Sequence, residues 1–408
     1  MRIMFAVPCY WPSQDGVTII TSYLAQGLAA RGHEVFVLAS AGNGGLQKLP
    51  ERDEHEGVKI ARMRIYTRWP LLIRGRDKKS TKKEYRRQIR EFAPDVLVVV
   101  CAQTWTLDWV MPYLKKLDCV KVFYSHGYSA WKEQYACREQ LLRRNVVGAW
   151  IEYKCRRYFE RLYRHIELFD RVIYLSEDSN ASVYAKKYGL TNGRILKNAI
   201  DDRFFQEDMR HTYEEKACVS FLFVANYNQN KNQEMLVRAF AAARLGKSRL
   251  NLVGFEENAY YDFLQELIRE KLSGQKDKEV IFHTHVSREA VIDLYRTSDV
   301  FVCSSRSEIY PVVAHEAAAT GMPIISTDVG MYGKISGAWI VKDEEQMREA
   351  MESLYGSAQE RARRGMAACE WVRGQGCRVQ DKVEWFEQDL LFNRRKRDEN
   401  KELDLRDV

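Results

Sequence analysis

The sequence has no long hydrophobic segment. Its most apolar run, from Val96 to Ala102, has seven residues, whereas a membrane-spanning helix needs about 20. The first ten residues, MRIMFAVPCY, lack the extended apolar region and the cleavage site of a secretory signal peptide. They are typical of a strand instead. These absences predict a protein without a membrane span.

The cysteines show no pattern that would form disulfides or bind zinc. There are nine of them, an odd number, and no two have C-x-x-C spacing. Their distribution argues against a disulfide framework and favours a reducing cytoplasm.

The composition is that of an ordinary globular protein. The chain has 408 residues, of which 46% are hydrophobic and 29% are charged. These values exclude a disordered or collagen-like chain and provide enough apolar material for two full cores.

Positive charge is concentrated in the first half of the chain. The total is +8, yet Arg62–Arg90 alone carries +10 and Arg138–Arg164 carries +5. The second segment also interleaves aromatic and basic residues at near-helical spacing, as helices on membrane surfaces do. Two interpretations stay open: contact with an anionic membrane or acceptor, or a solvated helix with its aromatic face buried. No recognition motif accompanies the charge, so nucleic acid is not expected as a partner.

Strands and helices alternate along the chain. The first strand precedes a helix near Ile19 to Arg31, and the run HEVFVLAS follows as a second strand. This is the βαβ order of an α/β fold. The alternation continues to about residue 200 and restarts near residue 214. We therefore predict two Rossmann-like domains, each built on a doubly wound parallel sheet, with ligands outside the carboxyl ends of the strands.

The predicted boundaries follow from where this alternation starts and stops. They are residues 1–200 for the first domain, 201–213 for a linker, 214–372 for the second domain, 377–392 for a helix that packs back towards the first domain, and 393–408 for a mobile charged tail.

A segment of the second domain combines a strand, two serines, a glutamate, an aromatic residue, a proline, an apolar helix and a G-x-P turn. Pro311 suits the first turn of this helix, and Gly321 suits its end. Glu316 is the only carboxylate of the helix, and a buried carboxylate needs donors such as ribose hydroxyls. Glu308 lies just before the first turn, where free N–H groups attract anions. The alternative is two exposed glutamates on a helix edge.

In this setting the sequence resembles the retaining glycosyltransferases of family 4, which have the GT-B fold. Glu308 and Glu316 match the family's E-x7-E signature, and Gly321-Met322-Pro323 follows as in the family. The resemblance implies two domains facing a central cleft, with a nucleotide-diphosphate sugar mainly on the second. It places Glu308 near the transferred sugar and Glu316 at the ribose. The diphosphate is expected at the helix start, which comprises Tyr310, Pro311 and Val312.

The loop VANYNQNKNQEML departs from the family pattern. The family has an arginine and then a lysine that both reach the diphosphate. Lys231 matches the lysine, but Asn226 stands at or near the arginine position. A missing cation there would cost about 3 kcal/mol of transition-state stabilisation. Either another basic residue or a neutral hydrogen bond from Asn226 compensates, or activity is weakened or lost. Lys231 itself has the alternative of a solvated loop lysine.

Two residues of the first domain are further candidates. Gly16 matches a turn glycine where the family's backbone approaches the donor phosphate, since glycine permits close approach and positive φ. An ordinary turn glycine is the alternative. His126 follows the strand VKVFY and matches a histidine that contacts the donor sugar near the reacting carbon. We expect its neutral imidazole to orient a sugar hydroxyl, not to act as a general base.

No metal or other cofactor is expected. His283 and His285 alternate as on a strand, which would put both rings on one side, but a third ligand is not evident. The D-x-D metal motif of the other transferase fold is also absent. Asn198 matches a family segment at the domain crossover, where we expect a structural role in the turn.

Together these features predict a retaining glycosyltransferase that uses a nucleotide sugar and a glycan or lipid-linked acceptor. The basic first half fits envelope polysaccharide assembly by a cytoplasmic protein that is peripheral at the inner face of the membrane. Two alternatives stay open: a sugar-nucleotide epimerase-like enzyme and a catalytically silent GT-B scaffold.

Overall fold

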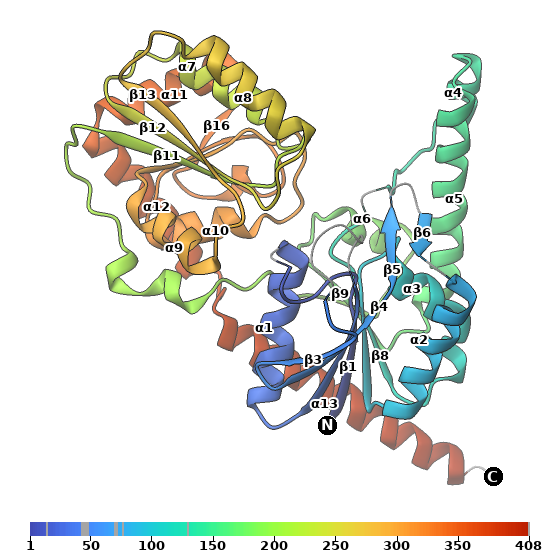
Figure 1. Ribbon diagram of the computed structural model, residues 1–408. Helices are drawn as coiled ribbons and strands as arrows, with labels where there is room; N and C mark the ends of the chain where they lie inside the picture. The colour runs from blue at the N-terminus through green and yellow to red at the C-terminus, as the bar shows by residue number, and fades with distance from the viewer. Residues whose placement is uncertain (14, 42–48, 69–71, 76, 129, 407–408) are drawn as a thin grey trace. The chain divides into compact units, whose positions relative to one another are not determined.

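The computed structural model describes residues 1–13, 15–41, 49–68, 72–75, 77–128 and 130–406. The chain divides into two compact units (Figure 1). Unit 1 comprises Met1–Asn198 and Val379–Val408, and unit 2 comprises Ala199–Arg378. Each unit is an α/β fold of its own.

Unit 1 is built on an eight-stranded sheet with the order β10-β9-β8-β7-β1-β2-β4-β3. Neighbouring strands are parallel except for β3, which runs antiparallel to β4 at the edge. The strands are β1 (Arg2–Ala6), β2 (Glu34–Ser40), β3 (Arg52–His55), β4 (Val58–Met63), β7 (Val96–Val100), β8 (Val120–Tyr124), β9 (Arg171–Tyr174) and β10 (Gly193–Ile195). A separate hairpin joins β5 (Ile65–Arg68) to β6 (Leu72–Gly75).

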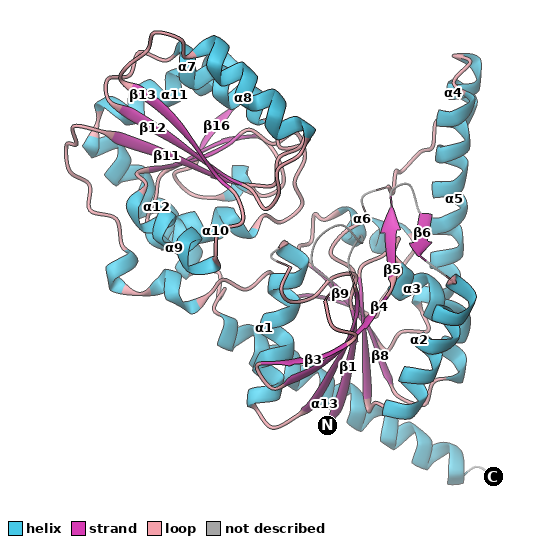
Figure 2. Ribbon diagram, in the orientation of Figure 1, coloured by secondary structure: helices cyan, strands magenta, loops and turns pink. Residues whose placement is uncertain are grey.

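The helices of unit 1, several of which pack against this sheet, are drawn in cyan in Figure 2. They are α1 (Gly16–Ala30), α2 (Lys78–Phe92), α3 (Trp105–Val110), the 3₁₀ helix η1 (Met111–Lys116), α4 (Cys137–Leu142), α5 (Val146–Ile166), α6 (Asn180–Lys187) and α13 (Val379–Arg406). The central strand β7, VLVVV, is buried at every position, which is typical of a parallel strand covered on both faces.

Helix α13 packs within unit 1 against α1, as expected for the last helix. A Cβ at Gly27 would lie 2.4 Å from a methyl group of Val383, so glycine is needed for this close approach. The expectation of a mobile tail from residue 393 is wrong, because α13 continues to Arg406. Asn393 is buried and donates to the carbonyl of Asp389, and Arg397 pairs with Asp118. These contacts favour continuation of the helix.

Unit 2 has a six-stranded, wholly parallel sheet with the order β13-β12-β11-β14-β15-β16. Its strands are β11 (Val219–Val224), β12 (Ser248–Val253), β13 (Lys278–His283), β14 (Val300–Cys303), β15 (Ile324–Thr327) and β16 (Trp339–Val341). Its helices are α7 (Gln233–Ala242), α8 (Ala259–Lys271), α9 (Arg288–Thr297), α10 (Val312–Thr320), α11 (Glu344–Gly356) and α12 (Ala358–Arg373), with the 3₁₀ helices η2 (Asp202–Phe205), η3 (Glu207–Met209) and η4 (Tyr332–Lys334).

Residues 201–213, expected to form a linker, belong to unit 2 and are well packed there. They form η2 and η3 and bury Phe204, Phe205 and Met209. The hydrophobic pattern of residues 201–213 did not predict this packing, because single-turn 3₁₀ helices are too short to show a helical period.

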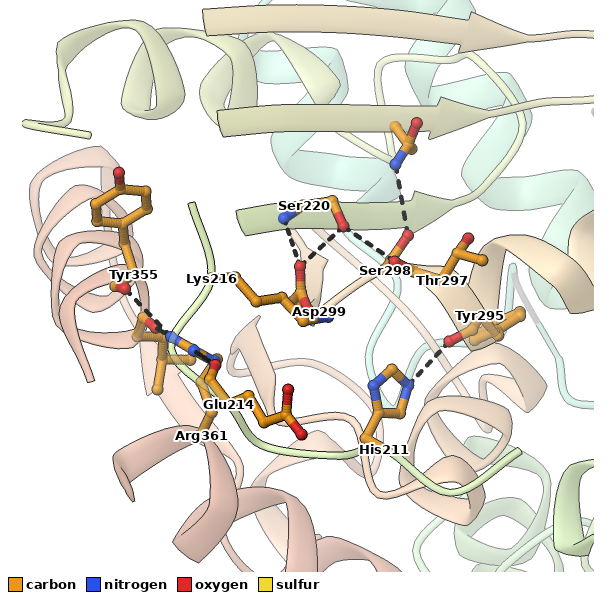
Figure 3. A network of polar contacts seen from close by, with 12 residues as sticks. His211, Glu214, Lys216, Ser220, Tyr295, Thr297, Ser298, Asp299, Tyr355 and Arg361 are labelled. Atoms are coloured by element: carbon orange, nitrogen blue, oxygen red, sulfur yellow. Dashed lines mark hydrogen bonds and ion pairs between the residues drawn. The ribbon is translucent and has the colours of Figure 1, made fainter. Parts of the chain in front are cut away.

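A polar network fastens the segment after η3 to the amino edge of the unit 2 sheet (Figure 3). The Asp299 carboxylate accepts hydrogen bonds from Lys216 and from both the N–H and the hydroxyl of Ser220. His211 bonds to the carbonyl of Tyr295, and burial lowers the pKa of this histidine. Arg361 donates to the carbonyl of Glu214. This edge is therefore occupied by structural contacts, which leaves the carboxyl edge for ligands.

Among the described residues, no helix has both the length and the apolar content to cross a membrane.

Candidate functional site

The carboxyl edge of the unit 2 sheet holds Glu316 on α10. This helix, VVAHEAAAT, consists mostly of small residues, so it packs closely and buries Glu316 to 1% exposure. Arg288, at the start of α9, donates to Oε1 of Glu316. The other oxygen, Oε2, is buried and accepts no hydrogen bond of good geometry from the described residues, although the Tyr295 hydroxyl lies near this carboxylate. A buried acceptor of this kind is costly unless a ligand donor satisfies it.

The amino end of α10 lies at the same edge. Pro311 occupies the N-cap position with extended backbone, and its own side chain does not cap the first-turn N–H groups. The helix proper begins at Val312. Tyr310 is buried, and its hydroxyl lies 2.9 Å from Nε2 of His315. An uncapped helix start of this kind favours an anion.

Glu308 and Lys231 meet at this edge. The Lys231 ammonium lies 2.6 Å from Oε1 of Glu308. The backbone of Lys231 is fixed by Asn228, whose side chain accepts from its N–H, and by Ser304, whose hydroxyl donates to its carbonyl. Gly330, with φ of 57°, packs against Glu308, where a Cβ would lie 3.0 Å from the Cβ of Glu308. Both charged groups are therefore held in place, and neither is a free loop residue.

Asn226 is exposed just after β11, and it forms hydrogen bonds to two other segments. Its side-chain oxygen accepts from the N–H of Phe255, after β12, and its carbonyl accepts from Gln233. The residue thus ties two loops of the carboxyl edge together, and it supplies no positive charge.

In unit 1, Gly16 is the first residue of α1, and it does not use the positive φ that glycine permits. Its φ lies outside the left-handed region, and a Cβ would meet nothing within 4 Å. The backbone therefore does not require glycine, and open space lies above it. Asp15 caps the helix by accepting from the N–H groups of Val17 and Thr18.

His126 follows β8 in a strained conformation. Its φ is 47°, and Cys101 and Gln103, after the neighbouring β7, have φ of 67° and 61°. Left-handed residues other than glycine cost energy and concentrate at functional sites. Nε2 of His126 is buried and has no hydrogen-bond partner among the described residues. Burial lowers the pKa of His126 to about 4, although Asp15 opposes the shift, so the imidazole is neutral at pH 7.

This pKa predicts that acid destabilises unit 1 through His126. The unfolded chain binds this proton near pH 6.5 and the folded chain only near pH 4, so the free energy of unfolding falls as the pH drops between these values. The loss approaches about 3 kcal/mol. His126→Asn keeps a residue that tolerates positive φ but removes the titration. Urea unfolding at several pH values should show a shallower acid slope for the variant; an unchanged slope would contradict the prediction.

His283 and His285 are not both on a strand, as their alternation had predicted. The strand β13 ends at His283, and His285 lies beyond it with φ of 54°, so strand alternation does not apply. Nε2 of His283 lies 3.0 Å from the side-chain oxygen of Asn251. Within the described ranges, no three His, Cys, Asp or Glu residues are grouped so as to hold a metal ion.

The structure gathers the candidates in two places. Gly16 and His126 lie at the carboxyl edge of the unit 1 sheet, and the remaining candidates lie at that of unit 2. Sequence reasoning missed Arg288 and the capping role of Asp15. No sequence pattern marks an arginine at a helix start as a ligand of a distant glutamate. Asp15 directly before α1, in contrast, is a residue type that commonly caps helices and could have been predicted to do so.

Two α/β units, each built on a mainly parallel sheet, are the architecture of the GT-B fold, and matches to known families assign the class of protein. The model of "Glycosyltransferase Family 4" matches residues 14–204, and that of "Glycosyl transferases group 1" matches residues 219–357. Together the two matches identify a glycosyltransferase of the family 4 type.

Single proteins resemble the chain only in part of its length or at low sequence identity. The chain is 37% identical over 174 residues to mannosylfructose-phosphate synthase of Agrobacterium fabrum, a match that spans 38% of this chain and 37% of that protein. Sucrose-phosphate synthase from Thermosynechococcus elongatus superposes with a TM-score of 0.70 at 18% identity, over 95% and 98% of the two chains. HepE of Anabaena, solved in complex with UDP-glucose, has a TM-score of 0.66 at 15% identity, over 96% and 99%.

Proposed function

We propose that this chain transfers a sugar, with retention of anomeric configuration, from a nucleotide-diphosphate sugar to a glycan or lipid-linked acceptor. The observation that carries the proposal is the buried Glu316, which has Arg288 on one oxygen and, on the other, no hydrogen bond of good geometry from a described residue. Two adjacent ribose hydroxyls are suitable donors for this oxygen. The HepE complex, which shares the fold, contains UDP-glucose.

The other groups at this edge suit the rest of the donor. The uncapped start of α10, at Tyr310 to Val312, offers backbone N–H groups to the diphosphate. Lys231 adds a cation, which exchanges its contact with Glu308 for one with phosphate oxygen. Glu308, released from Lys231, then accepts from hydroxyls of the transferred sugar. Asn226 contributes at most a neutral hydrogen bond.

A covalent enzyme intermediate is not part of the proposal. Asp15, at the carboxyl edge of the unit 1 sheet, already accepts four hydrogen bonds, from Ser13, from the N–H of Val17, and from the N–H and hydroxyl of Thr18. It is therefore a poor nucleophile. Instead, the bond from the anomeric carbon to the leaving diphosphate breaks while the acceptor oxygen bonds on the same face. The acceptor proton passes to the leaving phosphate oxygen.

The neutral His126 fits a role in orienting a sugar hydroxyl. Its unpartnered Nε2 can make one hydrogen bond without changing charge. For the acceptor, the basic segments of unit 1 favour a phosphate-bearing lipid carrier at an anionic membrane surface, in envelope glycan assembly.

The test is calorimetric binding of UDP, GDP, ADP and CMP to the full chain, with Glu316→Ala as the comparison. We expect one nucleoside diphosphate to bind at micromolar strength and to lose at least tenfold in affinity in the variant. Met366→Ala, at an exposed position of α12, is the matched control and should bind as the wild type does. If none of the nucleotides binds, the proposed donor site is wrong and a catalytically silent scaffold is favoured. The asparagine at position 226, where the family has an arginine, would then explain the missing binding.

A further inference from the structure

The helical hairpin of α4 and α5 presents apolar side chains that no described residue of unit 1 covers. All seven residues from Leu141 to Val147, with the sequence LLRRNVV, are exposed. Four of them are aliphatic, and Trp150 follows one turn later at 50% exposure. Figure 1 shows α4 and the first turns of α5 extending away from the strands of unit 1. We call Leu141, Leu142, Val146, Val147 and Trp150 the apolar tip.

One face of α5 continues from the apolar tip into a row of cations. Val147, Trp150, Lys154, Arg157, Arg161 and Arg164 follow one another at intervals of three and four residues, so they share one helix face. The first two are apolar and the last four are basic. The opposite face, with Cys155, Phe159 and Leu162, is buried in the core of unit 1. The exposed face is therefore available to a partner.

The basic row also lines a cavity of about 610 Å³. Lys154, Arg157, Arg161 and Arg164 line it together with Tyr153 and Tyr158 and with the two acids Asp108 and Glu160. Arg157 pairs with Glu160, and Arg161 lies 3.7 Å from Asp108. Lys154 lies over the ring of Trp150, 4.2 Å from its centre. Cations outnumber acids in this lining, so the cavity suits an anionic group.

We propose that the hairpin docks unit 1 on an anionic lipid bilayer, with the apolar tip inserted among the acyl chains and the basic row at the lipid phosphates. An aliphatic and tryptophan tip beside Arg143, Arg144 and the basic row has the chemistry of an interfacial helix. A second copy of this chain fits less well, because paired tips would bring four arginines together. The inference deepens the proposed lipid-linked acceptor, since it gives the enzyme its own contact with the membrane.

The test uses vesicle sedimentation without donor or acceptor, so it stays independent of catalysis. The full chain is expected to bind phosphatidylcholine vesicles containing 30% phosphatidylglycerol at least tenfold more tightly than pure phosphatidylcholine, and to bind more weakly as salt rises. A tip variant, Leu142→Ser with Val146→Ser and Trp150→Ser, should lose about tenfold in affinity at unchanged net charge. Met366→Ser with Phe392→Ser, at exposed positions outside the hairpin, is the matched control and should bind normally.

A charge variant separates the two parts of the surface. The variant combines Arg143→Gln, Arg144→Gln and Lys154→Gln. Its affinity for the anionic vesicles should fall about tenfold, and most of the salt dependence of binding should disappear. The control variant replaces three exposed lysines of unit 2 with glutamine, at Lys247, Lys276 and Lys342, and so loses the same net charge. Its affinity for the vesicles should change little. Nucleotide binding by every variant should match the wild type, which shows that unit 2 is intact.

Three results would overturn the proposal. They are no binding to anionic vesicles, binding that the tip variant leaves unchanged, and a concentration-dependent dimer that the tip variant abolishes. None of them affects nucleotide binding. Conversely, vesicle binding with no nucleotide binding would reject the proposed donor site and leave the docking surface in place.

Discussion

Lys231→Ala is expected to lower the rate of nucleoside diphosphate release from the donor by about 10²–10³-fold, the usual effect of removing one preorganised charge from a transition state. The Lys231 ammonium lies 2.6 Å from Glu308, and two hydrogen bonds between its backbone and the side chains of Asn228 and Ser304 hold the residue in place. With Asn226 in place of the family arginine, the chain has fewer cations for the leaving diphosphate. The remaining lysine should therefore carry a larger share of the stabilisation.

The measurement is donor turnover under saturating donor, with and without acceptor extract, beside calorimetric nucleotide binding. Glu308→Gln should reduce turnover while nucleoside diphosphate binding changes little, because the ribose contact through Glu316 is retained. Lys247→Ala, an exposed lysine at the start of β12 on the opposite edge of the sheet, is the matched control. Wild-type turnover by Lys231→Ala would show that the lysine serves only to hold Glu308.

The sequence allowed most of the unit 2 site to be predicted, because the site follows local rules. Pro311 and Gly321 mark the ends of α10 by their own backbone preferences, and the structure places them at its N-cap and C-cap. The small residues around Glu316 indicated close packing and burial, and both are present.

What could not be predicted depends on contacts distant in sequence. Arg288 is 28 residues from Glu316 and reaches it only because α9 and α10 pack together. The length of α13 was missed because residues 393–406 are highly charged, and charge alone is typical of a tail. Its stabilisation comes from partners such as Asp118, 279 residues away from Arg397. The roles of all the candidate residues towards a ligand stay predictions.

Removing Arg288 is expected to destabilise unit 2 strongly. Arg288→Met keeps a long side chain that can still pack near Phe204, over whose ring the guanidinium lies at 5.2 Å. It leaves Glu316, 1% exposed, without its cation. Breaking a buried pair from one side costs about 3–5 kcal/mol, because the remaining charge is neither solvated nor paired. Urea unfolding should show this loss.

Two further variants make the cause specific. Arg296→Met, on the same helix, removes an exposed ion pair with Asp293 and should cost less than about 1 kcal/mol. The double variant Arg288→Met with Glu316→Gln should recover most of the stability, because no unpaired charge remains buried. It should not recover nucleotide binding, since a glutamine cannot replace the charged acceptor that the ribose hydroxyls need. If the double variant recovers both stability and nucleotide binding, Glu316 is a structural carboxylate only. If it recovers stability alone, Glu316 contacts the nucleotide.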